Sequence, residues 1–143
     1  MGKYLGIDYG AARIGVSLSD PFKILASPLT TLHTEKKIEG TADKVAFVIK
    51  ENNVEKVVIG IPYHMNGKVG MQADEVREFI RLLKEKVDCE FIEWDERLTT
   101  VQAERIMREG KSSRKKRTKV IDVAAAVIIL QSFLDTQGNS LLS

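Results

Sequence analysis

The sequence predicts an α/β fold in which helices flank one mixed five-stranded sheet. Three strand-like stretches, at residues 3–8, 13–19 and 24–32, follow one another with only short turns between them. Two later strands, at 56–61 and 89–94, each come after an amphipathic helix, which is the pattern of right-handed crossovers between parallel strands. If the first strand is central, the chain forms three antiparallel strands and then adds two strands parallel to the first.

The hairpin near the start of the chain is the clearest local signal. The stretch "LGIDYGAARIGVSLSD", from Leu5 to Asp20, runs as a strand, turns at a glycine-containing segment and returns as a second strand. Pro28 marks the third strand as an edge or bulged strand, because proline has no N–H to give to a sheet. The later strand "KVVIGI" shows no polar alternation, as expected of a strand that is covered on both faces.

Four helices follow from the helical spacing of apolar residues and from helix start and stop signals. The first ends near residues 52–53, and the second carries apolar residues at helical spacing from Val76 to Val87. A capping box at Thr99 opens a third helix, which runs to about Glu109. The fourth, from about 120 to 134, is apolar almost all round, so we expect it to be buried against the sheet.

The composition is typical of one soluble globular domain. Of the 143 residues, 43% are hydrophobic and 29% are charged, which predicts a single domain over residues 1–143 with a frayed tail at 136–143. Cys89 is the single cysteine, so no internal disulfide can form and a reducing compartment fits. No apolar run is long enough to cross a bilayer, and the chain does not start like a signal peptide. We therefore expect a cytoplasmic protein with no membrane partner.

Positive charge is concentrated in one short stretch, called the basic segment below. Its six cations are Lys111, Arg114, Lys115, Lys116, Arg117 and Lys119, with no acid among them. Because the formal net charge of the whole chain is only +2, the remainder of the chain is acidic. A basic segment on an acidic body indicates contact with a polyanion such as nucleic acid. The alternative is a solvated loop that keeps the protein soluble.

Acidic residues lie at the ends of apolar elements that the topology brings together. Asp8 ends the first strand, and Asp95 and Glu96 end the last strand, so they open on the same rim of the sheet. Asp122 is expected in the first turn of the apolar fourth helix. Two of these acids have structural alternatives, since Asp8 can form the turn before Gly10 and Asp122 can stabilise a helix N-terminus.

Carboxylates that converge repel one another unless a cation lies between them, so this group predicts a metal site. Clustered oxygen ligands favour Mg²⁺ or Mn²⁺, whereas a zinc site calls for histidine or cysteine. The two histidines, His33 and His64, have no ligand spacing, which argues against zinc. Bound Mg²⁺ activates water and holds a phosphoryl group, and a pair of such ions about 4 Å apart clamps the attacking and leaving oxygens of a phosphodiester.

A family resemblance is carried by four stretches, namely "GIDYGAARIGVSLSD", "VVIGIP" with "NG" soon after, "WDERLTT" and "KVIDVAAAVIILQSFLD". In order and spacing they resemble the YqgF-type Holliday junction resolvases. These are bacterial RNase H-like proteins that are also linked to nucleolytic processing of precursor small-subunit ribosomal RNA. The resemblance covers nearly the whole chain. It implies an RNase H-like fold and a site for Mg²⁺ (or Mn²⁺) whose catalytic and metal-binding residues are Asp8, Glu96 and Asp122.

The choice of Glu96 comes from the resemblance and not from the residue pattern. Neighbouring residues of a strand point to opposite faces, so the sequence leaves Asp95 and Glu96 as alternatives. Arg97 is a candidate for contact with the scissile phosphate, or for neutralising the acids structurally. With the basic segment it makes up the predicted nucleic-acid-binding residues. The implied partner is branched DNA or precursor ribosomal RNA, and both a monomer and a homodimer are compatible with the sequence.

Two other interpretations compete with a nuclease. A strand, G-x-D-x-G and a returning strand also form the phosphate-binding hairpin of the actin, sugar-kinase and chaperone ATPases. Those proteins need two such lobes around a nucleotide, and 143 residues supply one. The other interpretation is a non-catalytic nucleic-acid-binding factor that uses the basic segment. Cleavage that requires Mg²⁺ and is lost in variants of the three acids separates this factor from a nuclease.

Overall fold

The structure is a computed structural model that describes residues 2–61, 71–95 and 114–137, with the backbone alone at 71–72 and 114–122. The elements in chain order are β1 (Lys3–Tyr9), β2 (Arg13–Ser19), β3 (Ala26–His33), α1 (Ile38–Glu51), β4 (Val54–Ile61), α2 (Met71–Lys86), β5 (Glu90–Asp95) and α4 (Arg114–Thr136).

These strands form one five-stranded sheet in the order β3-β2-β1-β4-β5. The first three strands are antiparallel neighbours, β4 lies parallel to β1, and β5 lies parallel to β4. β1 is therefore central, and the predicted mixed α/β sheet is confirmed. Pro28 lies on the edge strand β3, next to a register irregularity between Val16 and Ser17 of β2, which confirms the predicted edge or bulge.

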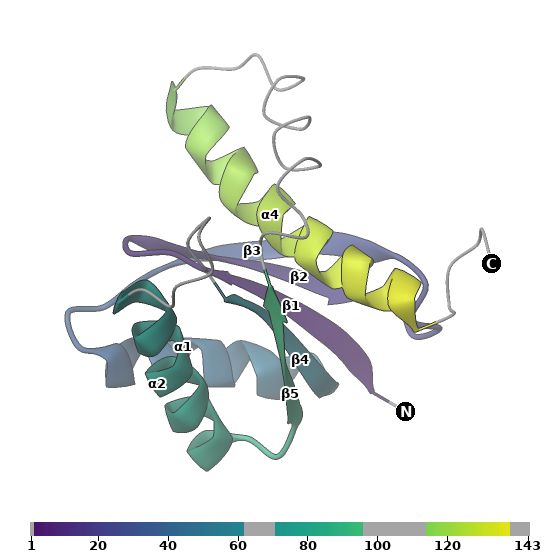
Figure 1. Ribbon diagram of the computed structural model, residues 1–143, viewed down its shortest axis with the longest axis horizontal. Helices are drawn as coiled ribbons and strands as arrows, with labels where there is room; N and C mark the ends of the chain where they lie inside the picture. Colours follow the sequence, from purple (N-terminus) through teal and green to yellow (C-terminus); the bar gives the residue numbers. More distant parts are fainter. Residues whose placement is uncertain (1, 62–70, 96–113, 138–143) are drawn as a thin grey trace.

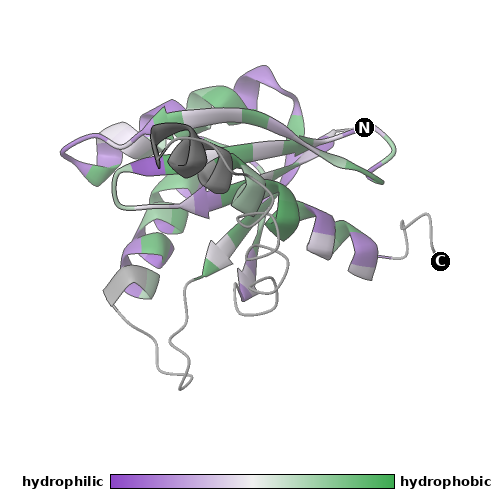
Figure 2. Ribbon diagram, turned by 90° about the horizontal axis from the view of Figure 1, so that it is seen from above, coloured by the Kyte–Doolittle hydropathy of each residue, from purple (hydrophilic) through white to green (hydrophobic). Residues whose placement is uncertain are grey.

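Helices cover the sheet on both faces. α4 lies across one face, and α1 and α2 lie against the other, as Figure 1 shows. Hydrophilic and hydrophobic residues alternate along the exposed helices (Figure 2), as amphipathic helices require. α1 ends where predicted, because the side chain of Asn52 donates to the carbonyl of Val48 at 2.8 Å and Asn53 takes a left-handed conformation with φ 52°.

Alternation along the strands divides the apolar side chains between two cores. Leu5, Ile7, Val57 and Ile59 are fully buried in a core with α1 and α2. Val58 packs on the opposite face, in a smaller core formed with the side chains of α4. A strand residue can therefore be assigned to the α4 face or to the α1/α2 face from the faces of its neighbours.

The start of β3 differs from the prediction by two residues. The sequence predicts a strand from Ile24, whereas β3 begins at Ala26. The carboxylate oxygen Oδ1 of Asp20 accepts hydrogen bonds from the backbone N–H groups of Ile24 at 2.7 Å and Leu25 at 2.9 Å. This Asx-type turn uses the two donors that an earlier strand start would need.

The start of α4 corrects two predictions. The helix begins at Arg114 and not near Val120, because lysine and arginine are good helix formers and no glycine or proline interrupts residues 114–120. Asp122 is therefore inside the helix, so the predicted position in the first turn, with its helix-dipole explanation, is wrong. From Arg114 onward the basic segment is helical, so the interpretation as a loop is also wrong there.

Two further predictions fall outside the described residues. The helix predicted at 99–109 is one of them. The other is most of the frayed tail predicted at 136–143. α4 runs to Thr136, and residues 138–143 are outside the described residues.

Candidate active site

Asp8 lies near the C-terminal end of β1, on the face that α4 covers. Its neighbours define this face, because Ile7 is buried with α1 and α2 and the ring of Tyr9 packs on Phe79 of α2 with centroids 4.9 Å apart. Strand alternation then assigns Asp8 to the opposite face. The side chain of Asp8 is half-buried, so a carboxylate is held at the sheet rim with partial access to solvent.

Glycines flank Asp8 on both neighbouring strands. Asp8 pairs with Gly15 of β2. On the other side, Ile7 pairs with Ile59 of β4, which brings Gly60 beside Asp8. Neither neighbour has a side chain, so the carboxylate has no crowding group from the adjacent strands in its own row. Gly15 and Gly60 are themselves buried, so other parts of the protein cover the row beside Asp8.

Trp94 of β5 completes this row, since it pairs with Gly60. Its ring meets Phe133 of α4 edge-on, with centroids 6.2 Å apart, so it lies on the α4 face together with Asp8. The indole Nε1 is buried and has no hydrogen-bond partner among the residues described. The α4 face near Asp8 therefore holds a buried N–H donor in addition to a carboxylate.

α4 crosses this face antiparallel to β1. Near the C-terminal end of the helix, Phe133 packs on Tyr4 with ring centroids 6.0 Å apart. Further towards its N-terminus, the helix lies directly over Gly6, where an added Cβ would be 2.8 Å from the carbonyl oxygen of Ala126. From the C-terminal end of α4 towards its N-terminal end, the residues of β1 in contact with the helix therefore run from Tyr4 to Gly6. The same direction leads to Asp8 on the strand and to Asp122, one helical turn before Ala126.

The faces of β5 distinguish Asp95 from Glu96. Trp94 lies on the α4 face, whereas Glu93 contacts α2, where its carboxylate is 3.2 Å from the guanidinium of Arg77. Asp95 therefore shares the α1/α2 face with Glu93. It also pairs with Ile61, which is buried in the α1/α2 core. Asp95 thus lies on the other side of the sheet from Asp8.

The other predicted site residues are described in part or not at all. Glu96, Arg97 and Lys111 lie outside the described residues. The backbone of Asp122 belongs to α4, as does that of the remaining basic segment at 114–119, and the side chains are not described there. Within the described ranges no group of three or more His, Cys, Asp or Glu side chains is arranged to hold a metal ion. Asp8 is the one predicted metal ligand whose side chain is described.

Arg13 is a candidate that the sequence analysis did not single out. It opens β2, where Ile14 and Val16 are buried towards α1 and α2, so it shares the α4 face with Gly15, the partner of Asp8. Arg13 is half-buried and takes part in an interaction within the protein. The signal was present in the sequence as the alternation of Arg13, Ile14, Gly15 and Val16.

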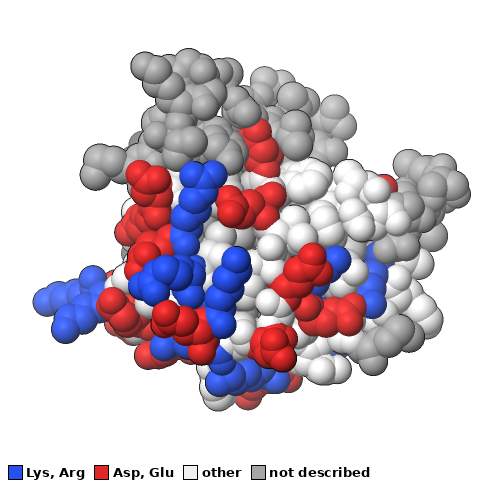
Figure 3. Space-filling view, turned by 60° about the horizontal axis from the view of Figure 1, so that its bottom comes forward, with Lys and Arg blue, Asp and Glu red and all other residues white. Residues whose placement is uncertain are grey.

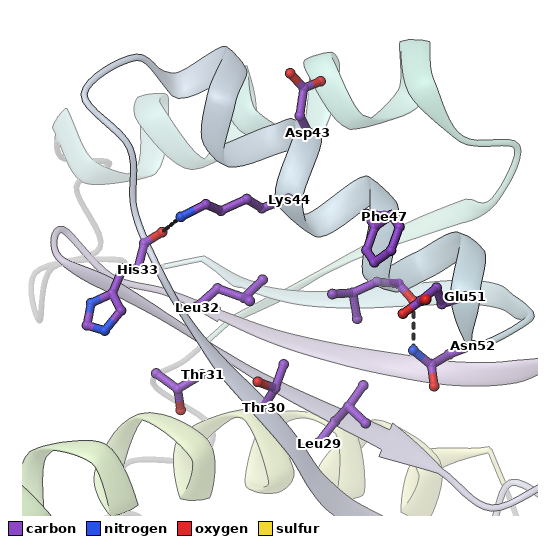
Figure 4. A pocket seen from close by; sticks show the side chains of 11 residues that line it. Leu29, Thr30, Thr31, Leu32, His33, Asp43, Lys44, Phe47, Glu51 and Asn52 are labelled. Atoms are coloured by element: carbon purple, nitrogen blue, oxygen red, sulfur yellow. Dashed lines mark hydrogen bonds between the residues drawn. The ribbon is translucent and has the colours of Figure 1, made fainter.

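The opposite face has a different character. Its acidic and basic side chains are interspersed (Figure 3), and several are paired across or along the helices, such as Lys86 with Asp43 at 2.6 Å. A groove of about 870 Å³ lies between β3 and α1 and is lined by residues that include Leu29, Leu32 and Phe47 (Figure 4). This groove contains none of the predicted site residues, so the α4 face remains the candidate active-site face.

Fold and site together define the class: a small α/β domain with a central β1 that presents a half-buried aspartate under a crossing helix. Comparison with known proteins identifies the family. A family model described as RuvX, Holliday junction resolvase, matches residues 2–136, and the chain belongs to this nuclease family. The predicted family is thereby confirmed, and nuclease function is favoured over the ATPase-like interpretation.

Curated relatives match nearly the whole chain. A protein of Protochlamydia amoebophila named "Putative pre-16S rRNA nuclease" is 49% identical over 141 residues, which cover 94% of each chain. A protein of the same name from Caldanaerobacter subterraneus subsp. tengcongensis is 45% identical over 139 residues, covering 96% of this chain and 99% of its own.

A solved structure confirms the fold at low sequence identity. T. thermophilus RuvC in complex with a Holliday junction substrate superposes with a TM-score of 0.64 at 12% identity, covering 96% of this chain and 97% of the other. No helix in the described ranges is long and apolar enough to cross a membrane.

Proposed function

We propose that this chain is a Mg²⁺-dependent (or Mn²⁺-dependent) nuclease that hydrolyses phosphodiester bonds of structured nucleic acid, with Asp8, Glu96 and Asp122 as its carboxylate site. The observation that carries the proposal is the antiparallel crossing of α4 over β1. Ala126 lies at Gly6, and from that contact Asp8 is two strand residues away and Asp122 is one helical turn away in the same direction. The strand step is about 7 Å and the helical step about 6 Å, so we expect the two acidic positions to be nearly level.

The faces of β5 support Glu96 as the third carboxylate. Trp94 lies on the α4 face with Asp8, and Asp95 lies on the other face. If the alternation continues for one more residue, position 96 returns to the α4 face. Asp95 is then a residue of the opposite face and not a primary metal ligand.

The donor set fits a hard divalent cation. All three proposed ligands are carboxylates, which Mg²⁺ and Mn²⁺ prefer. When bound there, the ion would lower the pKa of a water molecule and neutralise charge on the phosphate. The carboxylates of Asp8, Glu96 and Asp122 would hold and orient the ion, and the basic segment and Arg97 would bind the phosphate backbone.

We propose precursor small-subunit ribosomal RNA as the substrate class. The support is the name shared by relatives that are 49% and 45% identical over nearly the full length. A four-way DNA junction, which the family description names, is the alternative substrate. Both present the same phosphodiester chemistry, so the acids serve either substrate and the surrounding surface decides between them.

A cleavage assay tests the proposal. Purified protein is incubated with an end-labelled precursor rRNA fragment, and separately with a four-way DNA junction, in Mg²⁺, Mn²⁺ or EDTA. Asp8→Asn, Glu96→Gln and Asp122→Asn should each lower cleavage by about 100-fold or more, because members of one metal site act as a unit, while nucleic-acid affinity stays within a few-fold of the original protein.

Two acids serve as matched controls in this assay. Asp43→Asn on α1 and Asp95→Asn on the other face of β5 should leave cleavage within a few-fold of the original protein. Full activity of Asp8→Asn removes that residue from the site. Binding without any cleavage in the original protein supports the non-catalytic factor, and preferential cleavage of the DNA junction overturns the choice of substrate.

A further inference from the structure

We propose that Ser17 and Gly6 are positioning residues that dock α4 on the β1–β2 hairpin and thereby bring Asp122 to Asp8. This inference rests on the proposed function, because it assigns these residues a part in assembling that site. Neither residue is at the rim, and neither is expected to touch metal or nucleic acid.

The Ser17 hydroxyl forms a direct link between the hairpin and α4. Its Oγ donates a hydrogen bond to the carbonyl oxygen of Ala126 at 2.7 Å, across 109 residues of sequence, and the contact is buried. Ser17 itself is fully buried. A carbonyl oxygen has two lone pairs, so Ala126 can accept this bond in addition to its bond within the helix.

Gly6 is the residue that lets the helix come this close. It pairs with Ser17 across β1 and β2. A Cβ at Gly6 would lie 2.4 Å from Oγ of Ser17, 2.7 Å from Cβ of Leu130 and 2.8 Å from the carbonyl oxygen of Ala126. Two of these three atoms belong to the helix, so any side chain at this position would push α4 away from the sheet.

The link lies beside the proposed site. The next row of the hairpin towards the rim contains the pair of Asp8 and Gly15, and the next turn of α4 in that direction contains Asp122. The height of α4 above Gly6 and its axial position at Ser17 therefore set the separation of Asp8 and Asp122. A shift of about 1 Å there would carry directly to the metal ligands.

Other contacts hold the far end of α4, so losing this link need not detach the helix. Gln131 bridges to the start of β3, with its Oε1 accepting from the N–H of Ala26 at 2.9 Å and its Nε2 donating to the carbonyl of Ile24 at 2.9 Å. Phe133 packs against Tyr4 and Trp94. Removing the Ser17 hydroxyl should therefore loosen the end of α4 nearest the site while the fold remains.

Ser19 provides a matched control for Ser17. It is a second buried serine of β2 on the same face, with 3% of its surface exposed. Its Oγ accepts from the backbone N–H of Tyr4 at 2.9 Å and donates to the carbonyl of Asp20 at 3.0 Å. These bonds join it to β1 and to the residue that follows β2. Ser17→Ala and Ser19→Ala thus remove the same group from the same strand, and only the first bonds to α4.

The first experiment measures Mg²⁺ binding by calorimetry, and kcat and KM for cleavage, in both serine variants. Ser17→Ala should weaken Mg²⁺ binding about tenfold, in the range seen when a residue supporting a metal ligand is lost. It should lower kcat while KM for nucleic acid stays within about twofold. Ser19→Ala should leave both properties near those of the original protein. Equal Mg²⁺ affinity and equal kcat in the two variants overturn the inference.

A second experiment uses the single tryptophan of the chain, because Trp94 packs against Phe133 of α4. Gly6→Ala should change its emission and its quenching by acrylamide, since the helix is displaced. Gly40→Ala is the control, because its Cβ would meet only the flexible side chain of Glu35, at 3.2 Å. Gly6→Ala should also weaken Mg²⁺ binding. The double variant Gly6→Ala/Ser17→Ala should not restore this binding, since the clashes with α4 remain. Unchanged Trp94 emission in Gly6→Ala, or recovery in the double variant, contradicts the inference.

The two proposals fail in different ways. If the original protein neither binds Mg²⁺ nor cleaves, or if Asp8→Asn is fully active, the proposed function is wrong. If the original protein cleaves and Asp8→Asn does not, while Ser17→Ala behaves like Ser19→Ala, only the positioning role of Ser17 is wrong.

Discussion

At the scale of single residues, Asp8 and Tyr9 show how one strand serves two purposes. The two are adjacent in β1 and lie on opposite faces, so Asp8 belongs to the proposed site and Tyr9 to the packing of α2. Burial, the negative charge of Glu75 and a hydrogen bond from the phenol to Glu75 raise the pKa of Tyr9 to about 12. The folded protein therefore favours the neutral form of the Tyr9 phenol.

This shift predicts a loss of stability at alkaline pH. The pKa of an unfolded tyrosine is about 10, so the stability that Tyr9 contributes is complete below pH 10 and is lost as the pH rises towards about 12. Tyr9→Phe should remove this loss, so the difference in free energy of unfolding between the original protein and Tyr9→Phe should change over this range. Urea unfolding at several pH values measures it. Tyr4→Phe is the control, and an identical pH profile for the original protein and Tyr9→Phe contradicts the prediction.

At the scale of elements, the sequence predicted which segments are helices and strands better than where they begin. Helical spacing of apolar residues identified α1 and α2, a hairpin signal identified β1 and β2, and an apolar run without polar alternation identified β4. The starts of β3 and α4 were set by other forces. Asp20 holds Ile24 and Leu25 in a turn through its side chain, and the helical Arg114 to Lys119 carry no apolar stripe that periodicity could detect.

The helical start of α4 sharpens the prediction for the basic segment. Since Lys115 and Arg117 are in a helix, glutamine is the substitution that removes charge while keeping helix propensity. If both contact phosphates, the double variant should bind nucleic acid more weakly. Its log–log salt slope should be smaller by about 0.7 to 0.9 for each lost contact.

Lys50 of α1 and Lys84 of α2 provide the control for this charge removal. Both are exposed, and both belong to helices that lie on the side of the sheet away from α4. Changing them to glutamine removes the same net charge from the chain, and the salt slope should stay as it was. Affinity measured from about 50 to 200 mM salt gives the slopes. Equal slopes in both double variants would mean that the basic segment acts only through net charge.

At the scale of the whole molecule, the proposed site depends on the topology of the sheet. The sequence placed Asp8 and the end of β5 on one rim, because parallel strands that neighbour each other open in the same direction. It could not choose between Asp95 and Glu96, since that choice depends on which face of β5 meets α4. Trp94 against Phe133, and Glu93 against Arg77, supply this information, and both contacts join residues that are distant in sequence. For Asp122 the sequence supplied the helix, while the crossing at Gly6 and Ser17 supplies the direction in which the helix runs across β1.

A carboxylate cluster at one rim should also affect the stability of the entire domain. Without a cation the proposed acids repel one another, so Asp8→Asn or Asp122→Asn should raise the melting temperature in EDTA. Mg²⁺ that binds only the folded protein adds RT ln(1 + [Mg²⁺]/Kd), which is about 1.4 kcal/mol at ten times Kd and a few degrees of melting temperature for a domain of this size. The variants should lose most of this gain, so their order relative to the original protein should reverse. Melting curves of the three proteins in EDTA and in millimolar Mg²⁺ test this, with Asp43→Asn expected to follow the original protein in both buffers. If the original protein gains nothing from Mg²⁺ and both variants melt lower in EDTA, the acids are structural and the proposed metal site is wrong.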